Sequence, residues 1–208
     1  MISSFPRIQE ILIATTNEGK AYEIIELLHG CAKDFIRLND LTQAPEPVEN
    51  GESFRANASI KARYYASFSA MPAVADDSGL MVDALDGAPG VHSARLVGPE
   101  RSDAERNKKL LDLLSKLPDE AGRKARFICS ACFFDPASEI EIIEEGILQG
   151  RIGHSPRGES GFGFDPLFIP EGYDQTLAEL GVKIKNHISH RKIAFELLKS
   201  KIINIEPE

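Results

Sequence analysis

Short apolar runs alternate with amphipathic segments along the chain, a pattern that predicts an α/β protein. The apolar run at residues 11–14 predicts a buried strand, and the polar turn at residues 15–20 leads into a helix expected over residues 21–28. A second strand is expected over residues 34–38, and the Ala-rich segment 53–68 predicts a second helix. Strands that alternate with helices in this way are typical of a largely parallel sheet.

The middle of the chain predicts two more short strands and a helix. Residues 73–75 form one expected strand, which brings the polar residues 76–79 to its carboxyl end, and residues 80–85 form another. A capping-box pattern, Ser-Asp-Ala-Glu at residues 102–105, precedes five leucines at helical spacing. A helix is therefore expected from there through Leu117.

The last part of the chain adds antiparallel strands. Residues 126–134 and 139–148 are rich in strand-forming residues and are separated by a short turn, so they predict a hairpin in a mixed sheet. A loop with five glycines is expected over residues 150–163, and loops of this length are often functional. The final helix is expected over residues 189–201. Its apolar positions, which are expected to face inward, are Ile193, Ala194, Leu197 and Leu198.

The composition is that of an ordinary globular protein, and its charge narrows the possible partners. The 208 residues are 42% hydrophobic, and no repeat or linker divides them, so a single domain over residues 1–208 is expected. Lys and Arg number 24 against 32 Asp and Glu, a net charge of −8, which argues against binding nucleic acid polymers or anionic membranes. No apolar run has the length of a signal peptide or a membrane span, so a cytoplasmic location is expected.

The three cysteines suit a reducing compartment because an odd number cannot all pair within one chain. Cys129 and Cys132 form a CxxC pattern, but they lie in an expected strand, where positions three apart face opposite sides. We therefore expect two core or near-surface residues and not a zinc or disulfide site.

Two motifs in the first half of the chain have the chemistry to bind phosphate or a metal. The turn at residues 15–20, Thr-Thr-Asn-Glu-Gly-Lys, joins a strand to a helix, where backbone amides and the helix dipole attract anions. An ordinary helix-capping turn is the alternative. Asp76 and Asp77 are adjacent carboxylates, whose repulsion a cation or a proton-transfer role would offset, with a solvated turn as the alternative. Because side chains alternate along a strand, one carboxylate is expected to face a ligand and the other the scaffold.

Two motifs in the second half have the chemistry to recognise a nucleotide. Residues 158–166 combine glycines, which allow close approach of the backbone, with Phe162 and Phe164 for stacking and Asp165 for hydrogen bonding. A plain β-turn is the alternative. Residues 189–192, Ser-His-Arg-Lys, place positive charge at the expected start of the final helix, where it is unfavourable without a nearby anion. A solvated basic face is the alternative.

Taken in order, five motifs make the chain resemble the Ham1-like family of non-canonical purine NTP pyrophosphatases, the inosine and xanthosine triphosphatases. The motifs are TTNEGK at residues 15–20, ENGESFRANASIKA at 49–62, ADDSGLMVDALDGAPGVHSAR at 75–95, GFGFDPLFIP at 161–170 and SHRKIA at 189–194. The resemblance spans almost the whole chain.

The resemblance implies an α/β fold with an elongated mixed β-sheet flanked by helices and two lobes around a central substrate cleft, usually as a homodimer. It implies Mg²⁺-dependent hydrolysis of ITP, dITP or XTP to the monophosphate and pyrophosphate, which removes deaminated purines from the nucleotide pool. Asp77 would bind Mg²⁺ and accept the proton of the attacking water. The residues that would bind the nucleoside triphosphate are Thr15, Thr16, Asn17, Glu18, Gly19, Lys20, Lys61, Ser78, Phe162, Gly163, Phe164, Asp165, Lys185, His190 and Arg191.

Two positions depart from the pattern of the family that the chain resembles. That family usually has a metal-binding acidic residue three positions before the glycine that corresponds to Gly51, and here that position is Val48. Glu49, or else Glu46, is then expected to supply the second metal ligand after a small shift of the loop. Phe164 stands where many relatives have Tyr or Trp, which keeps the ring but loses its polar group.

Base selectivity is expected to depend on a hydrogen-bond donor. A donor from His190 or Arg191 near position 2 of the purine would meet the amino group of guanine donor to donor and so disfavour GTP.

Three other functions are the alternatives to this activity. One alternative is a Maf-type nucleotide pyrophosphatase of different base preference. A second is a nucleotide-binding protein that has lost catalysis, which Val48 favours, and a third, a binder of nucleic acid polymers, is disfavoured by the net charge.

Overall fold

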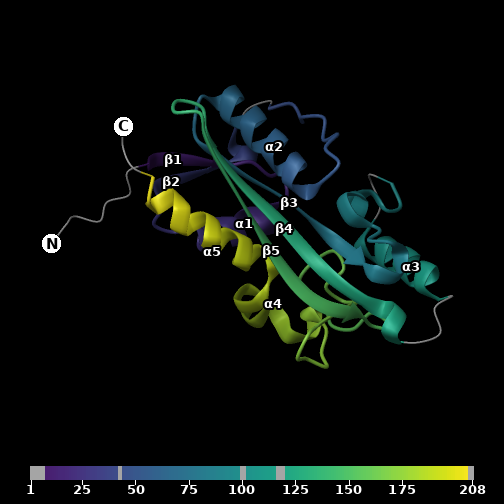
Figure 1. The fold of residues 1–208 in the computed structure, drawn as a ribbon. Coiled ribbons are helices and arrows are strands. Elements are labelled where there is room, and N and C mark those ends of the chain that lie inside the picture. Colours follow the sequence, from purple (N-terminus) through teal and green to yellow (C-terminus); the bar gives the residue numbers. More distant parts are fainter. Residues whose placement is uncertain (1–7, 42–43, 99–101, 116–119, 206–208) are drawn as a thin grey trace. The chain divides into compact units, whose positions relative to one another are not determined.

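The computed structural model describes residues 8–41, 44–98, 102–115 and 120–205 (Figure 1). Its strands are β1 (Ile8–Ile13), β2 (Ala32–Arg37), β3 (Ala73–Val82), β4 (Lys124–Asp135), β5 (Ile140–Ile152) and β6 (Phe168–Pro170). Its α-helices are α1 (Glu18–Leu27), α2 (Phe54–Ser69), α3 (Asp103–Leu114), α4 (Leu177–Ile188) and α5 (His190–Ile203). Short 3₁₀ turns cover Leu38–Asp40, Asp83–Leu85, Gly90–Arg95 and Glu120–Arg123.

Within the described residues the six strands form one sheet in the order β2-β1-β3-β4-β5-β6. Strand β1 pairs in parallel with β2 and with β3, whereas β5 pairs antiparallel with β6. The predicted α/β fold with a mixed sheet and flanking helices is therefore confirmed.

The residue contacts divide the chain into two compact units. The first unit contains the described residues up to Asp77, residues 129–146 and the described residues from Arg191 onward. The second unit contains the described parts of residues 78–128 and 147–190. Strands β3, β4 and β5 each contribute residues to both units.

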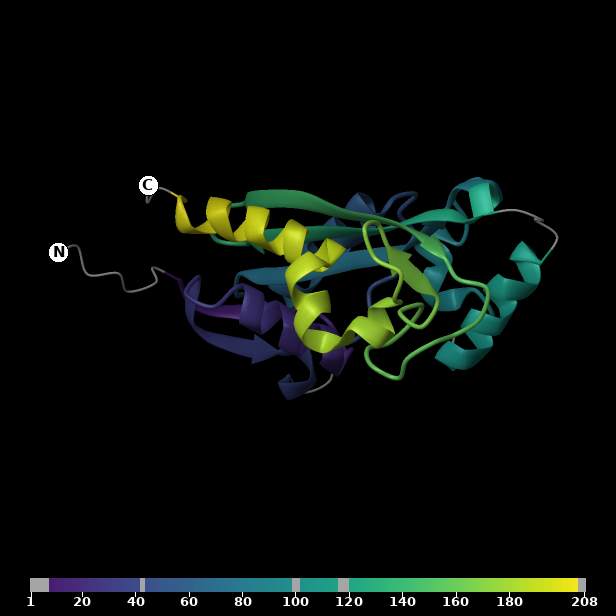
Figure 2. The same cartoon turned by 90° about the horizontal axis from the view of Figure 1, so that it is seen from below.

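The first unit has a hydrophobic core on each face of its strands. Alternate residues of β1 enter different cores, with Ile11 and Ile13 in the core beneath α1 and α5 and Leu12 in the core beneath α2. Helices α1 and α5 thus cover one face and α2 covers the other (Figures 1 and 2). Cys129 belongs to the first core and Cys132 to the second, so the prediction that these buried thiols face opposite sides is confirmed.

The second unit is built around its own core. Leu80 and Val82 of β3 and Phe168 of β6 pack there against Leu110 and Leu114 of α3, all of them fully buried. The capping box expected at the start of α3 is present, because Ser102 accepts a hydrogen bond from the Glu105 amide while the Glu105 carboxylate accepts from the Ser102 amide. Leu117, the expected end of this helix, lies outside the described residues.

Strand β3 is longer than predicted. Residues 73–75 and 80–85 were expected as separate strands with residues 76–79 at a strand end, but Ala73–Val82 is one continuous strand. Asp76 and Asp77 therefore lie in its middle, and both are almost completely buried. The expectation was wrong because carboxylates in a strand interior normally cost too much, and here cations and amide donors offset that cost.

Other boundaries differ for local reasons. Helix α1 begins at Glu18 and not at residue 21, because Asn17 caps it by accepting a hydrogen bond from the Lys20 amide at 3.0 Å. Strand β5 continues to Ile152, so the glycine-rich loop is shorter than expected. In α5, the positions Ile193 and Leu197 expected to face inward are exposed. The buried apolar residues of α5 are Ala194, Phe195, Leu198 and Ile202.

Strand β6 and helix α4 were not predicted. The signal for α4 is nevertheless present, because Thr176 and Glu179 have the spacing of a capping box and form one in the structure. Gly181 disfavours the prediction of a helix in this segment, because glycine is unfavourable inside helices. In the structure its φ of +78° kinks α4 one turn after the start.

Candidate functional site

The residues expected to form the site are distributed over both units. The first unit holds Thr15, Thr16, Asn17, Glu18, Gly19, Lys20, Glu49, Lys61, Asp77 and Arg191. The second unit holds Ser78, Phe162, Gly163, Phe164, Asp165, Lys185 and His190.

Asp76 is a buried carboxylate surrounded by positive charge. The Nζ atom of Lys20, from α1, lies 3.2 Å from its Oδ2 atom, and the Nη2 atom of Arg191, from α5, donates to the same oxygen at 3.2 Å. Burial by itself would raise the pKa of Asp76, but the charges of Lys20 and Arg191 hold it far below its ordinary range. Asp76 is therefore the carboxylate of the pair that faces the scaffold, and it stays ionised.

Asp77 points to the opposite face of β3, toward α2. The Nδ2 atom of Asn57 donates to its Oδ2 atom at 3.1 Å, and the Nζ atom of Lys61 lies 3.4 Å from its Oδ1 atom. Asn57 and Lys61 are four positions apart, so they share one face of the helix. Burial raises the pKa of Asp77, and the charges of Lys61 and Lys20 offset only part of this effect. Asp77 is thus a more basic carboxylate than its neighbour.

The loop before α2 brings a second carboxylate to the same lysine. The Nζ atom of Lys61 lies 3.3 Å from Oε2 of Glu49, while Val48 is 78% exposed. The amide of Gly51 donates to Oδ1 of Asn57 at 2.8 Å, and a Cβ atom on Gly51 would lie only 2.6 Å from that oxygen. The close approach of the loop to α2 thus requires glycine, and it turns Glu49 inward.

These carboxylates are suited to sharing Mg²⁺ with a substrate. No group of three or more His, Cys, Asp or Glu side chains able to hold a metal occurs among the residues that the structure describes. Mg²⁺ is commonly bound by only one or two carboxylates together with substrate phosphates. Asp77 and Glu49, both beside Lys61, supply oxygen ligands of this kind, whereas Glu46 is exposed. Lys61 is a cation here, because the charges of Asp77 and its neighbours raise its pKa despite the opposing effect of burial.

The turn before α1 keeps its polar groups accessible. Asn17 caps the helix, and the Oγ1 atom of Thr15 accepts a hydrogen bond from the Asn17 amide at 3.2 Å. Thr16, Asn17, Glu18 and Gly19 are exposed. The turn is thus a helix cap, as the alternative interpretation held, and the same geometry leaves the amino end of α1 open to an anion.

In the second unit, Asp165 organises the glycine-rich loop. Its Oδ2 atom accepts hydrogen bonds from the Phe162 amide at 3.0 Å and from Nζ of Lys185 at 2.8 Å, and both Asp165 and Lys185 are buried. Gly161 has a φ of +84°, and a Cβ atom there would overlap the carboxylate of Asp165. The Lys185 ammonium lies 4.0 Å from the centroid of the Phe162 ring, a cation–π contact.

The two phenylalanines of this loop have different environments. Phe162 is partly exposed, whereas Phe164 is 4% exposed and belongs to the core of the second unit. Phe162 is therefore the more accessible ring of the two, and Phe164 contributes to packing.

The histidine and arginine of the SHRK motif are both buried. His190 stacks on Phe127 of β4, with ring centroids 4.7 Å apart and an interplanar angle of 11°. Arg191 is 1% exposed and donates to Asp76 and Glu23, so its guanidinium holds carboxylates. The positive charge of Arg191 at the start of α5 is thus balanced by carboxylates within the protein. Ser78 follows Asp77 on β3 and is partly exposed.

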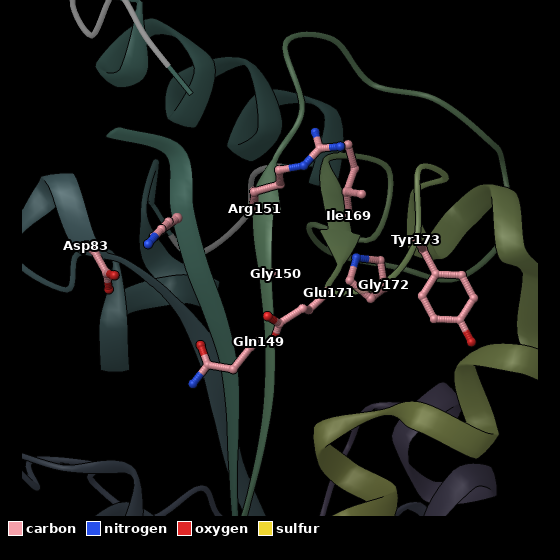
Figure 3. Close-up of a pocket in the computed structure, with 10 residues that line it drawn as sticks. Asp83, Gln149, Gly150, Arg151, Ile169, Glu171, Gly172 and Tyr173 are labelled. Carbon is pink, nitrogen blue, oxygen red and sulfur yellow. The ribbon is translucent and has the colours of Figure 1, made fainter. Parts of the chain in front are cut away.

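A separate hollow of about 590 Å³ lies in the second unit, along the pairing of β5 with β6 (Figure 3). The residues that line it are Asp83, Lys124, Gln149, Gly150, Arg151, Ile169, Pro170, Glu171, Gly172 and Tyr173. Gly150 is required there, since a Cβ atom would overlap the carbonyl oxygen of Ile169. None of these lining residues was predicted to act in the site.

Sequence reasoning missed Asn57, which donates to Asp77, and Glu23, which pairs with Arg191. Asn57 could have been found, because it lies one helical turn before Lys61 in a motif already recognised. Glu23, which pairs with Arg191, sits four residues before Leu27 in an ordinary amphipathic helix. Nothing in that pattern distinguishes it from a solvated glutamate.

Comparison with known proteins supports one family. A model of the Ham1 family matches residues 11–201. The dITP/XTP pyrophosphatase of Lactobacillus acidophilus is 46% identical, over 92% of this chain and 96% of its own, and that of Geobacter sulfurreducens is 44% identical, over 91% and 94%. The solved structure of a HAM1 protein from Coxiella burnetii has a TM-score of 0.85 and 39% identity, covering 94% of this chain and 98% of that one. No helix in the described part of the chain has the length and hydrophobicity needed to cross a membrane. The fold, the site motifs and these matches agree, and the chain belongs to the Ham1 family.

Proposed function

We propose that this chain is a pyrophosphatase that cleaves dITP, XTP and ITP into the nucleoside monophosphate and pyrophosphate, and so removes non-canonical purines from the nucleotide pool. The relatives named dITP/XTP pyrophosphatase support the substrate class. The observation that carries the proposal is the asymmetric carboxylate pair of β3. Asp76 forms ion pairs with Lys20 and Arg191. Asp77 contacts the Asn57 amide and the Lys61 ammonium, and its own pKa is raised by burial.

Asp77 is proposed as the proton acceptor. Attack of water at the α-phosphorus requires a base that takes one proton of the water as the new P–O bond forms and the bond to pyrophosphate breaks. The raised pKa of Asp77 makes its carboxylate the better base of the pair. Lys61, a cation 3.4 Å from it, can stabilise charge on the phosphate oxygens.

Phosphate and metal binding are assigned to the first unit. The exposed amides at the start of α1, together with Lys20, are suited to the triphosphate. Asp77 and Glu49 would hold Mg²⁺ jointly with the substrate. When bound, the ion draws negative charge from the phosphate oxygens and from the leaving pyrophosphate.

Base recognition is assigned to the second unit. Phe162 offers a partly exposed ring for stacking, and Asp165 and Lys185 lie beside it as an ion pair. The donor that disfavours guanine is proposed to come from His190, whose ring stacks on Phe127, or from Arg191. Ser78 is assigned to substrate contact next to the proton acceptor.

The remaining expectations stay proposals of the same kind. We propose a single catalytic domain that works as a homodimer in the cytoplasm on free nucleotides. Sedimentation velocity measures the oligomeric state directly, and a monomer at micromolar concentration would refute the dimer.

Hydrolysis of ITP, XTP, dITP, GTP and ATP tests the activity, with and without Mg²⁺ and with pyrophosphate and orthophosphate assayed separately. We expect pyrophosphate from the first three, far above that from GTP and ATP, and only with Mg²⁺. Orthophosphate as the first product would place the attack at the γ-phosphorus and refute the mechanism.

Replacing the proton acceptor tests its role. Asp77→Asn should lower kcat by roughly 10²- to 10⁴-fold while the thermal unfolding temperature stays near that of the wild type. Asp86→Asn is the matched control, because Asp86 is exposed and its φ of +51° suits asparagine. Near-normal turnover by Asp77→Asn would remove Asp77 from the mechanism. No turnover by the wild type would favour a binding protein without catalysis.

A further inference from the structure

Helix α3 forms hydrogen bonds to both backbone polar groups of Gly163 in the glycine-rich loop. The amide of Gly163 donates to Oδ2 of Asp103 at 2.7 Å, and Nδ2 of Asn107 donates to the carbonyl oxygen of Gly163 at 3.1 Å. Asp103 and Asn107 are four positions apart on α3, so both reach the loop from one face of the helix. The helix therefore grips Gly163 from two sides.

The Asn107 amide is oriented by this contact. A carbonyl oxygen only accepts hydrogen bonds, so the nitrogen of the Asn107 side chain must face Gly163. Asn107 is 4% exposed, and its Oδ1 atom is buried without a hydrogen-bond partner among the described residues. An unsatisfied acceptor costs stability, and an apolar side chain of similar size would avoid that cost. The presence of asparagine at position 107 is thus explained by the hydrogen bond that its Nδ2 atom donates to Gly163, and not by packing.

The grip acts on the ring assigned to the base. Gly163 has a φ of +64°, a conformation that costs glycine little but that glycine also leaves easily. Phe162 precedes it directly, and the Phe162 amide is held by Asp165. The Phe162 backbone is thus held at two points, by Asp165 at the Phe162 amide and by α3 at the neighbouring Gly163. Loss of the anchors on α3 frees one of them.

We propose that Asp103 and Asn107 are positioning residues that set the purine selectivity of the enzyme by fixing the Gly163 peptide and, through it, the Phe162 ring. This inference rests on the proposed function for its substrate. Both residues act through Gly163, to which each makes a hydrogen bond. A ring held in one place discriminates between hypoxanthine and guanine better than a mobile ring, because the surrounding donors and acceptors then meet the base at fixed positions.

Two substitutions and one conservative variant test the proposal. Asp103→Ala and Asn107→Leu each remove one hydrogen bond to Gly163, and each should lower the ratio of kcat/KM for ITP to that for GTP by roughly tenfold. The loss should arise mainly from a higher KM for ITP, with a smaller change in kcat. Asp103→Asn keeps an acceptor for the Gly163 amide and should restore most of the selectivity.

Ser102→Ala is the matched control, because it removes the cap of α3 without touching Gly163. It should lower stability and leave the selectivity ratio unchanged. Hydrogen exchange of the Gly163 amide gives an independent readout, and it should become faster in Asp103→Ala but not in Asp103→Asn.

The outcomes separate this inference from the proposed function. A wild-type protein that releases no pyrophosphate from ITP refutes the function, and the selectivity claim falls with it. An active wild type with unchanged selectivity in Asp103→Ala and Asn107→Leu refutes only the positioning role. Equal loss of selectivity in Ser102→Ala would also refute it, since helix stability would then explain the effect.

Discussion

Replacing Arg191 by methionine tests the reasoning about the first unit most directly. Arg191 is 1% exposed, and its guanidinium donates to two carboxylates, Asp76 and Glu23. Methionine is unbranched and apolar, so Arg191→Met removes the charged guanidinium and keeps a side chain similar to the aliphatic part of arginine. Asp76 would then keep only Lys20 as a direct ionic partner among the contacts described above.

The expected cost follows from the burial of the pair. Breaking a buried ion pair by removing one partner costs roughly 3–5 kcal/mol, because the other charge stays in a poorly solvated site. Lys20 still partners Asp76, and the Glu23 side chain is 16% exposed and can reach water. We therefore expect the lower end, about 3 kcal/mol, which for a chain of this size lowers the melting temperature by roughly 6–12 °C.

Urea unfolding at neutral pH measures this loss, and the chain offers a matched control. Arg37 also pairs with two carboxylates, those of Asp40 and Glu18, but its side chain is 35% exposed. Arg37→Met should therefore cost less than about 1 kcal/mol. If Arg191→Met costs no more than Arg37→Met, the assignment of a buried structural ion pair is refuted.

A double-mutant cycle separates the pair from its surroundings. Asp76→Asn with Arg191→Met removes both charges at once, so the double variant should lose less stability than the two single losses combined. We expect a coupling energy of at least about 1 kcal/mol. Additive losses would show that the two side chains do not stabilise each other.

Three further predictions concern an amide, a carboxylate and the thiols. Asn57→Ala removes the amide that Asp77 shares with the loop before α2, so it should cost about 1–3 kcal/mol in urea unfolding and lower kcat/KM for ITP at least roughly tenfold; wild-type values of both would contradict this. Burial by itself would raise the pKa of Glu141, but the hydrogen bond from Arg63 lowers it below its ordinary value. Glu141 thus contributes stability that is present above about pH 4.3 and is lost as the pH falls through its folded pKa, and Glu141→Gln should flatten this acid-side loss in urea titrations between about pH 5 and 3. The three buried thiols should react with a disulfide reagent only as fast as the protein opens, and rapid labelling of the folded protein would contradict their burial.

The sequence predicted the elements whose local signals agree with their packing. The capping box of α3 and the alternation of apolar residues in β1 act over a few residues, and the structure confirms both. Cys129 and Cys132 lie on opposite faces of their strand because side chains alternate with a period of two. In each case the tertiary structure uses the preference that the segment already has.

The errors arose where distant residues override local preference. No local signal shows that Asp76 can lie inside a long strand, since its cations come from Lys20 and Arg191, 56 and 115 positions away. Phe164 and Arg191 look accessible in a motif rich in glycine or positive charge, and only the packed structure shows that both are buried. The sequence therefore predicted the candidate residues and the two faces of the Asp76–Asp77 pair, but not the burial of Phe164 and Arg191.

The alternation of β3 has a consequence for how this gene can change. Asp76, the scaffold counter-ion, and Asp77, the proposed proton acceptor, are consecutive residues whose side chains lie on opposite faces of the strand. Inserting or deleting one residue just upstream in β3 would turn each carboxylate to the other side, where it would meet the wrong cations. Such an indel would keep both carboxylates and still exchange their environments. The strand should therefore accept substitutions far more readily than changes of length, and a one-alanine insertion before Asp76 would abolish turnover more completely than most single replacements around it.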